Sequence, residues 1–312
     1  MPTGCDSKVT RLLSAPRDYA KNRVPGTLCY ALNNKMLWKE ARMRTRPLVL
    51  AVAVLAMLGL VPRAKVSAIA WSDEDMVTTA PQFVASIHNG KNPRSGNQFC
   101  TGSLIAQRWV LTAAHCFDEN PAITSVIVGG SIKRAVVEVF TPQQYKLLPP
   151  DIAYLAGFDI ALLKLDRPSK RITPARLPAF KQDVIEGAAY TYGYGIDQNG
   201  VDTGRLGARK VLVESGVWAE KLYPFLMNRQ ISAWGERPYL VYGEDGTVST
   251  NRFADAAVCK GDSGGPLLVD NSSGLLLIGV VSYGVDCHQA APSVYTKVSM
   301  YTRWIERTIT GS

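Results

Sequence analysis

The sequence is poor in the side chains that bind metals. Its 312 residues include only three histidines and six cysteines. The cysteines form no Cys-x-x-Cys pair and the histidines are scattered, so no spacing typical of a zinc site occurs. Signatures of nucleotide or heme binding are absent as well. We therefore expect neither a metal nor a cofactor.

A hydrophobic run long enough to span a membrane is also missing. The longest apolar stretch, 47–61, has about 15 residues, whereas a spanning helix needs about 20. Three arginines precede it within 42–46, and small residues follow it up to Ala68. A basic flank, an apolar core and a small-residue end are typical of a secretory signal. We predict that 43–68 is a signal peptide and that the protein is secreted.

The segment before this signal, residues 1–42, is polar and basic without periodicity, so we predict an unstructured extension. Two alternatives remain open for it. An uncleaved signal would anchor the chain in a membrane, with 1–42 as a cytoplasmic tail. Alternatively, Met43 is the true start and 1–42 is never translated, because signal sequences normally lie at the very N-terminus.

Residues 69–312, which follow the predicted signal, lack an excess of charge of one sign. The formal net charge is +9, but residues 1–68 hold 12 Lys/Arg and 3 Asp/Glu, which leaves 23 of each kind in 69–312. A globular part without net charge has no overall attraction for phosphate. Nucleic acid is therefore not an expected partner.

A motif of small residues around one serine stands out in 69–312. Gly-Asp-Ser-Gly-Gly-Pro occupies 261–266, directly before an apolar run. Such a sequence favours a tight turn that projects the Ser263 hydroxyl, which needs a base and an orienting group to act as a nucleophile. Candidates for both exist, because His115 ends the apolar stretch 109–115 and Asp159 opens another one, 159–165.

These three segments, in the order His, Asp, Ser, resemble the chymotrypsin-like (trypsin-fold) serine proteases over about residues 69–309. The resemblance implies that Ser263 is the nucleophile, His115 the general base and Asp159 the group that orients the imidazole. It also implies that the N–H groups of Gly261 and Ser263 form the oxyanion hole. The small number of cysteines is typical of secreted bacterial members.

The same resemblance implies an all-β fold of two six-stranded antiparallel Greek-key β-barrels with a C-terminal α-helix. Short β-branched runs separated by turn residues agree with it. The expected peptidase domain, 69–312, divides into a first barrel at about 69–178, a second at about 179–298 and a helix at about 299–309. Residues 216–257 show no readable strand pattern. The expected strands are 82–88, 99–104, 109–112, 123–128, 135–140, 159–165, 187–195, 210–214, 265–269, 275–283 and 293–298.

Two of the cysteines, Cys5 and Cys29, precede the signal and are uninformative. The family resemblance pairs the other four as Cys100–Cys116 and Cys259–Cys287. Both bridges suit an oxidising compartment.

Substrate-binding residues follow from the resemblance by counting from the nucleophile. The floor of the specificity pocket falls on Ala257, and Ser282 and Gly284 belong to the strand that binds the substrate backbone. Ser293 stands where many relatives have glycine and narrows the pocket. These residues predict a preference for small to medium uncharged P1 side chains.

A different alignment of the pocket loop remains open. A shift of one or two residues would bring Asp255 or Asp286 into the pocket. A carboxylate there would select Lys or Arg at P1, as in trypsin.

The activation sequence of the family, Ile-Val-Gly-Gly after a basic residue, is missing. Counting back from Pro81 puts the corresponding N-terminus near Ile69, directly after the small-residue end of the signal. We therefore predict that signal cleavage frees Ile69 and that its ammonium pairs with Asp262. A separate propeptide step remains open.

These observations together predict a secreted serine endopeptidase that works through an acyl-enzyme. The alternatives are a catalytically silent binding module and an esterase with the same triad. Expected partners are protein or peptide substrates and a proteinaceous inhibitor, with membrane contact only through an uncleaved signal. We expect a monomer.

Overall fold

The computed structural model describes most of the residues after position 78, all within the unit Ala64–Ser312. The predictions for 1–42, for the signal at 43–68, and for Ile69, Asp286 and Cys287 lie outside the described residues. Side chains are described except for 236–242 and 248–255, where only the backbone is. The described ranges are 79–93, 97–118, 124–183, 186–197, 199–213, 228–242, 248–255, 257–284 and 291–311.

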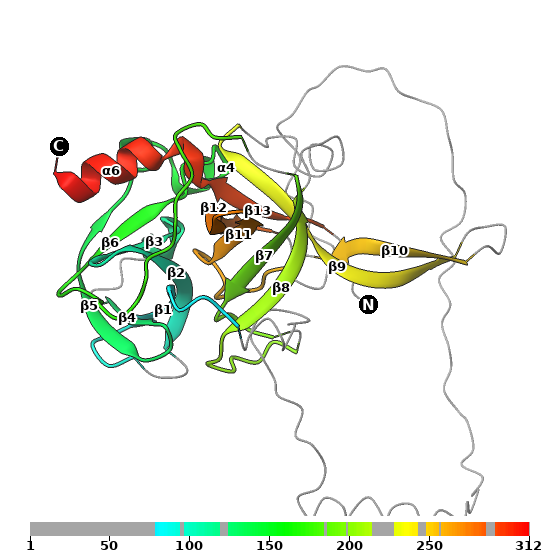
Figure 1. Cartoon of the computed structure of the whole chain (residues 1–312), viewed down its shortest axis with the longest axis horizontal. Coiled ribbons are helices and arrows are strands. Elements are labelled where there is room, and N and C mark those ends of the chain that lie inside the picture. Colours follow the sequence, from blue (N-terminus) through cyan, green and yellow to red (C-terminus); the bar gives the residue numbers. More distant parts are fainter. Residues whose placement is uncertain are drawn as a thin grey trace, which may run out of the picture. The chain divides into compact units, whose positions relative to one another are not determined.

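Six antiparallel strands close the first barrel in the order β1-β2-β3-β6-β5-β4 (Figure 1). β6 has the sequence Ala-Leu-Leu-Lys-Leu and is buried except for the half-buried Lys164, as expected for a strand that packs inside a closed sheet. The strands are β1 (Val84–Asn89), β2 (Gln98–Ala106), β3 (Trp109–Thr112), β4 (Thr124–Val128), β5 (Ile132–Phe140) and β6 (Ala161–Leu165).

The second barrel closes in the same way, through β9-β13-β12-β11-β7-β8 and a pairing of β8 with β9. A further strand, β10, pairs with β9 alone, and Figure 1 shows the two extending away from the barrel as a ribbon. The predicted fold of two six-stranded barrels is confirmed. The strands are β7 (Gly187–Gly193), β8 (Gly207–Val213), β9 (Gln230–Tyr242), β10 (Val248–Asp255), β11 (Pro266–Asn271), β12 (Gly274–Tyr283) and β13 (Ser293–Lys297).

The predicted C-terminal helix is α6 (Thr302–Thr310), which follows a 3₁₀ turn, η2 (Val298–Met300). It buries Ile305 in the core and ends at Gly311, whose φ of +75° suits a glycine. Two short helices were not predicted, α3 (Gln143–Leu147) and α4 (Pro150–Leu155). Each begins directly after a proline, and α4 also has Pro150 at its first position, where the fixed φ of proline favours a helix start.

Within the described segments, no helix combines the length and apolar character needed to cross a membrane.

The turn that carries Ser263 belongs to the second barrel but is bonded to the first. Thr101 in β2 donates its N–H to the Ser263 carbonyl over 2.8 Å and its hydroxyl to the Gly261 carbonyl over 3.0 Å. The Thr101 hydroxyl in turn accepts the Tyr194 N–H over 3.0 Å. The two barrels are therefore joined at the position of the predicted nucleophile.

Gly264 makes this close approach sterically feasible. Its φ is +83°, and a Cβ atom there would overlap the Thr101 carbonyl and Thr112 Oγ1. We expect Gly264→Ala to lower the free energy of unfolding by about 3 kcal/mol, from overpacking and a strained backbone together. The control is Gly274→Ala at φ +94°, where a Cβ meets nothing within 4 Å. It should lose only about 1 kcal/mol, and equal losses in urea denaturation would contradict the steric argument.

Candidate active site

His115 and Asp159 lie together because their strands are neighbours. β3 ends at Thr112, which pairs with Ala161 at the start of β6. Residues just after β3 and just before β6 therefore meet at one rim of the barrel. His115 opens the 3₁₀ turn η1 (His115–Phe117). Its Nδ1 lies 2.7 Å from Asp159 Oδ2, and its backbone N–H donates to Asp159 Oδ1 over 2.9 Å.

Asp159 is fully buried and is also held by the second barrel. Ser282 in β12 donates its hydroxyl to Asp159 Oδ2 over 2.5 Å. Thr296 in β13 donates its hydroxyl to the Asp159 carbonyl over 2.7 Å. The sequence singled out Ser282 only as part of the substrate-binding strand, and it did not single out Thr296. The carboxylate is thus fixed by both barrels, which leaves little freedom for its orientation.

The charge of Asp159 governs the titration of His115, whose side chain is 28% exposed. Burial lowers the pKa of His115, but the attraction and hydrogen bond of Asp159 outweigh burial and raise the pKa above the ordinary value of 6.5. A third hydrogen bond of the carboxylate, from Ser282, helps to keep it in place in either charge state of the ring.

This pKa has a consequence for activity. A general base must be neutral, so kcat/KM should fall as the pH decreases, with an acidic midpoint above 6.5. The free energy of unfolding depends on pH in the opposite direction. Protonated His115 stabilises the fold fully below pH 6.5, and this contribution disappears as the pH rises through the folded-state pKa. A pH profile of peptide hydrolysis with a midpoint below 6.5 would contradict the assignment.

Ser263 lies beside this pair. Its carbonyl oxygen is 3.9 Å from the Sγ of Cys116, the residue that follows His115. The described residues show no hydrogen bond from the Ser263 hydroxyl to the imidazole. Such catalytic bonds are often long or misaligned without substrate. The structure therefore brings the three predicted residues to one place, while the Ser263–His115 bond stays a prediction.

Within the described part of the chain, the backbone of this turn leaves two N–H groups without protein acceptors. Three N–H groups are bonded: Asp262 to the Cys259 carbonyl over 3.1 Å, Gly264 to the Val281 carbonyl over 2.8 Å, and Gly265 to the Asp262 carbonyl over 2.9 Å. Among the described residues, the N–H groups of Gly261 and Ser263, on either side of Asp262, donate to no protein atom. Two free donors flanking one residue form an anion-binding arrangement, as expected of an oxyanion hole.

Asp262 is fully buried under this turn. Its carboxylate accepts the N–H of Gly195 and the N–H of Cys259, each over 2.8 Å. Burial raises the pKa of Asp262 to about 7, although these two bonds oppose the shift. A Cβ at Gly195 would lie 2.7 Å from the carboxyl carbon, so glycine is needed there. Among the described residues, no cationic side chain pairs with Asp262.

The predicted pocket residues Ala257 and Ser293 are in contact. Both are fully buried, and the Ala257 N–H donates to the Ser293 hydroxyl over 3.1 Å. Gly284, at the end of β12, is exposed. The backbone of Asp255 lies at the end of β10, but its side chain is not among those described. Arg209, a cation in β8 that is only 3% exposed, stands in no motif that would single it out.

The cysteines near the site are oxidised. Cys100 and Cys116 form the predicted disulfide, and Cys259 is also disulfide-bonded. The pairing of Cys259 with Cys287 stays a prediction. Donor atoms of Cys100, His115 and Cys116 lie within 4.8 Å of one another, but both sulfurs are bonded to each other and offer no thiolate to a metal.

Comparison with known proteins agrees with this geometry. The trypsin family model matches residues 73–305. Among solved structures, the chain is similar to neuropsin, a serine protease expressed in the limbic system of mouse brain, with 26% sequence identity and a TM-score of 0.56. The match covers 74% of this chain and 95% of neuropsin. The chain belongs to the trypsin family of serine proteases.

Proposed function

We propose that this protein is a secreted serine endopeptidase in which Ser263, His115 and Asp159 form the catalytic triad. The observation that carries the proposal is the buried Asp159 carboxylate. It holds the His115 ring over 2.7 Å beside a serine turn in which two N–H groups have no acceptor among the described residues. A silent binding module would have no need for these features together.

In the proposed mechanism, Ser263 Oγ attacks the peptide carbonyl while His115 takes its proton. The carbonyl oxygen gains negative charge and is bound by the N–H groups of Gly261 and Ser263. Asp159 keeps the proton of the neutral ring on Nδ1 and stabilises the imidazolium, without becoming protonated. His115 then protonates the leaving amine. Water, activated by His115, hydrolyses the acyl-enzyme in the second half.

Covalent labelling tests this proposal directly. We expect a sulfonyl fluoride or an organophosphonate to modify the mature protein once per chain, at Ser263, because only an activated hydroxyl reacts at a useful rate. Intact mass and peptide mapping give the stoichiometry and the position. Absence of labelling together with absence of peptide hydrolysis would favour the silent binding module. Labelling with hydrolysis of esters alone would favour the esterase.

For the substrate, we propose small to medium uncharged P1 side chains. Supporting this, Ala257 offers no charge, and the Ser293 hydroxyl is occupied by the Ala257 N–H. A panel of chromogenic peptides that differ only at P1 tests the preference. A strong preference for Arg would overturn it and would point to Asp255 or Asp286 in the pocket.

For activation, we propose that the ammonium of Ile69 pairs with Asp262 after signal cleavage. The fully buried carboxylate, with its pKa raised to about 7, lacks a cationic side chain among the described residues. An ammonium would stabilise its charged form, and a buried carboxylate needs such a partner. N-terminal sequencing of active protein tests this proposal. A mature start at Trp71 or later with full activity would rule it out.

A further inference from the structure

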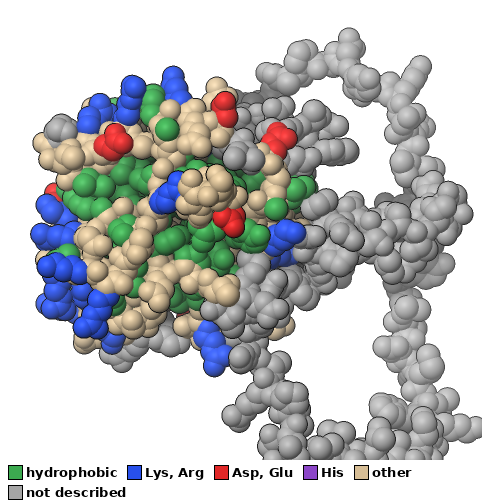
Figure 2. Space-filling view, in the orientation of Figure 1, with side chains coloured by type: hydrophobic (Ala, Val, Ile, Leu, Met, Phe, Trp, Pro, Cys, Tyr) green, Lys and Arg blue, Asp and Glu red, His purple; other side chains and the backbone are tan. Residues whose placement is uncertain are grey.

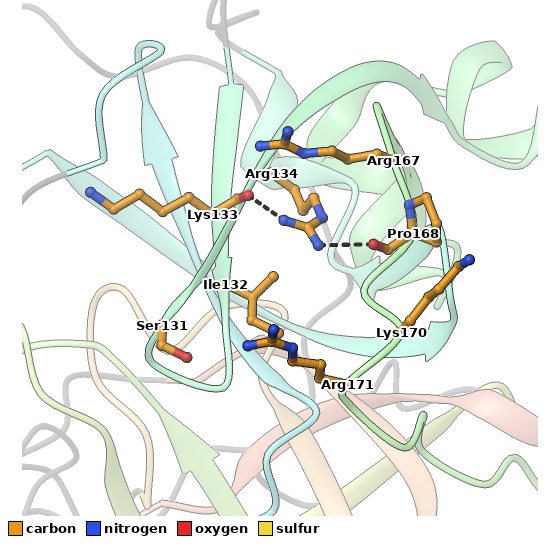
Figure 3. A pocket seen from close by; sticks show the side chains of 8 residues that line it. All are labelled: Ser131, Ile132, Lys133, Arg134, Arg167, Pro168, Lys170 and Arg171. Atoms are coloured by element: carbon orange, nitrogen blue, oxygen red, sulfur yellow. Dashed lines mark hydrogen bonds between the residues drawn. The ribbon is translucent and has the colours of Figure 1, made fainter.

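A groove lined by cations lies on the first barrel. Two segments form it, the start of β5 with the turn before it, and the residues that follow β6 (Figure 3). The hollow has a volume of about 580 Å³. We call it the basic groove; its lining residues are Ser131, Ile132, Lys133, Arg134, Arg167, Pro168, Lys170 and Arg171.

Five of the eight lining residues are cationic and none is acidic. Figure 2 shows Lys and Arg gathered on this side of the molecule. Ion pairs offset little of the charge. Among the described residues, the one ion pair with a groove cation joins Arg167 to Asp166 over 3.6 Å. Because residues 69–312 carry no net charge overall, this concentration is local and not a general property of the surface.

The groove is shaped before any ligand binds. Arg134 donates to the carbonyls of Lys133 and Pro168, each over 2.8 Å, and so joins the two segments (Figure 3). Burial and the neighbouring Arg167 lower the pKa of Arg134. In Figure 3, Lys133 and Lys170 extend from opposite flanks. The cations Lys133, Lys170 and Arg171 are exposed. They can bind anions without breaking a bond that holds the fold.

The position of the groove relates it to the active site. Asp159 lies two residues before β6 and Arg167 two residues after it. At about 3.3 Å per residue, an extended strand of this length separates the two by at most about 26 Å. A polypeptide that follows the length of β6 from the Asp159 end to the groove would need roughly eight extended residues. A second segment of a polypeptide already bound at the active site is held at a high effective concentration near the groove.

We propose that the basic groove is an accessory site that binds an acidic segment of a polypeptide substrate, several residues from the bond that is cut. This inference rests on the proposed protease function. A short carboxylate-rich segment fits better than a long nucleic acid. Without the five groove cations, residues 69–312 hold 18 Lys/Arg and 23 Asp/Glu, a net charge of −5, so attraction is confined to the groove within a Debye length of about 10 Å. Guanidinium groups also match carboxylates in geometry.

A binding experiment tests the groove without catalysis. The protein carries Ser263→Ala, and the probe is a labelled peptide with eight glutamates, followed by fluorescence anisotropy at about 50 mM salt. We expect the triple variant K133Q/K170Q/R171Q to bind at least tenfold more weakly. The matched control K91Q/R205Q/R307Q removes three exposed cations elsewhere and should bind like the parent. Equal affinity of both triple variants would overturn the proposal.

Kinetics test the role in substrate capture. Peptide substrates carry either eight glutamates or eight glutamines, joined to either end by a Gly/Ser linker of about eight residues. With intact Ser263, we expect glutamates at one of the two ends to raise kcat/KM about tenfold over glutamines at the same end. This gain should vanish in K133Q/K170Q/R171Q and at 0.5 M salt.

Other outcomes separate the two proposals. If heparin or duplex DNA bound more tightly than the glutamate peptide and lost this binding in K133Q/K170Q/R171Q, that result would overturn the substrate assignment. If no peptide is cleaved, the protease function fails. Groove-dependent peptide binding would then still show the site, but its role in substrate capture would be overturned.

Discussion

Replacing Ser263 by alanine is expected to lower kcat for peptide hydrolysis by about 10⁶, because no other group in the proposed mechanism can form the acyl-enzyme. Residual hydrolysis should persist above the rate in water, since the free N–H groups of Gly261 and residue 263 still bind the oxyanion. The side chain of Ser263 makes no hydrogen bond within the described residues. Folding stability should therefore hardly change, which thermal unfolding can check.

The control for this variant is Ser273→Ala, in the exposed turn between β11 and β12. It should keep full activity and stability. If Ser263→Ala retained more than a hundredth of the activity, another nucleophile would have to act and the triad would be wrong. If it lost stability along with activity, inactivity could reflect unfolding, so the melting temperatures of both variants belong to the result.

Replacing Asp159 by asparagine should lower kcat by about 10⁴. The His115 backbone N–H needs an acceptor at the Oδ1 position, so the amide oxygen takes that place. The amide NH₂ then faces Nδ1, at the position where Oδ2 lies now. It donates to that nitrogen and forces the ring proton onto Nε2. An imidazole protonated there cannot accept the proton of Ser263.

The same substitution removes the charge that raises the pKa of His115, so the pKa should fall. Its measurement by NMR of the ring separates loss of the base from general damage. Asp166→Asn is the matched control at the other end of β6, where the residue is exposed and its carboxylate accepts the Ala135 N–H over 3.1 Å and pairs with Arg167 over 3.6 Å. It should keep kcat within a factor of two. An unchanged His115 pKa in Asp159→Asn would show that the pair does not act as proposed.

The strands that carry the active site could be predicted because their signals are local. Apolar runs such as 109–115 and 159–165 mark strands, and small residues at 261–266 mark a turn. The predicted barrels are confirmed, and the strands in the two apolar runs, β3 and β6, pair with each other in the first barrel. The ribbon of β9 and β10 escaped prediction, as β10 pairs with β9 alone and its sequence has no regular alternation. The helices α3 and α4 are too short to show a period.

The sequence by itself determined which residues carry the chemistry, because a nucleophile, a base and a carboxylate each stand in a recognisable stretch of chain. Only the tertiary structure decided what surrounds them. Ser282 and Thr296 lie more than 120 residues from Asp159 along the chain, yet both bond to it. The basic groove likewise joins two segments that are separated by the rest of β5, by α3 and α4, and by β6. Such contacts depend on which strands become neighbours when the barrels close, and no local pattern encodes that.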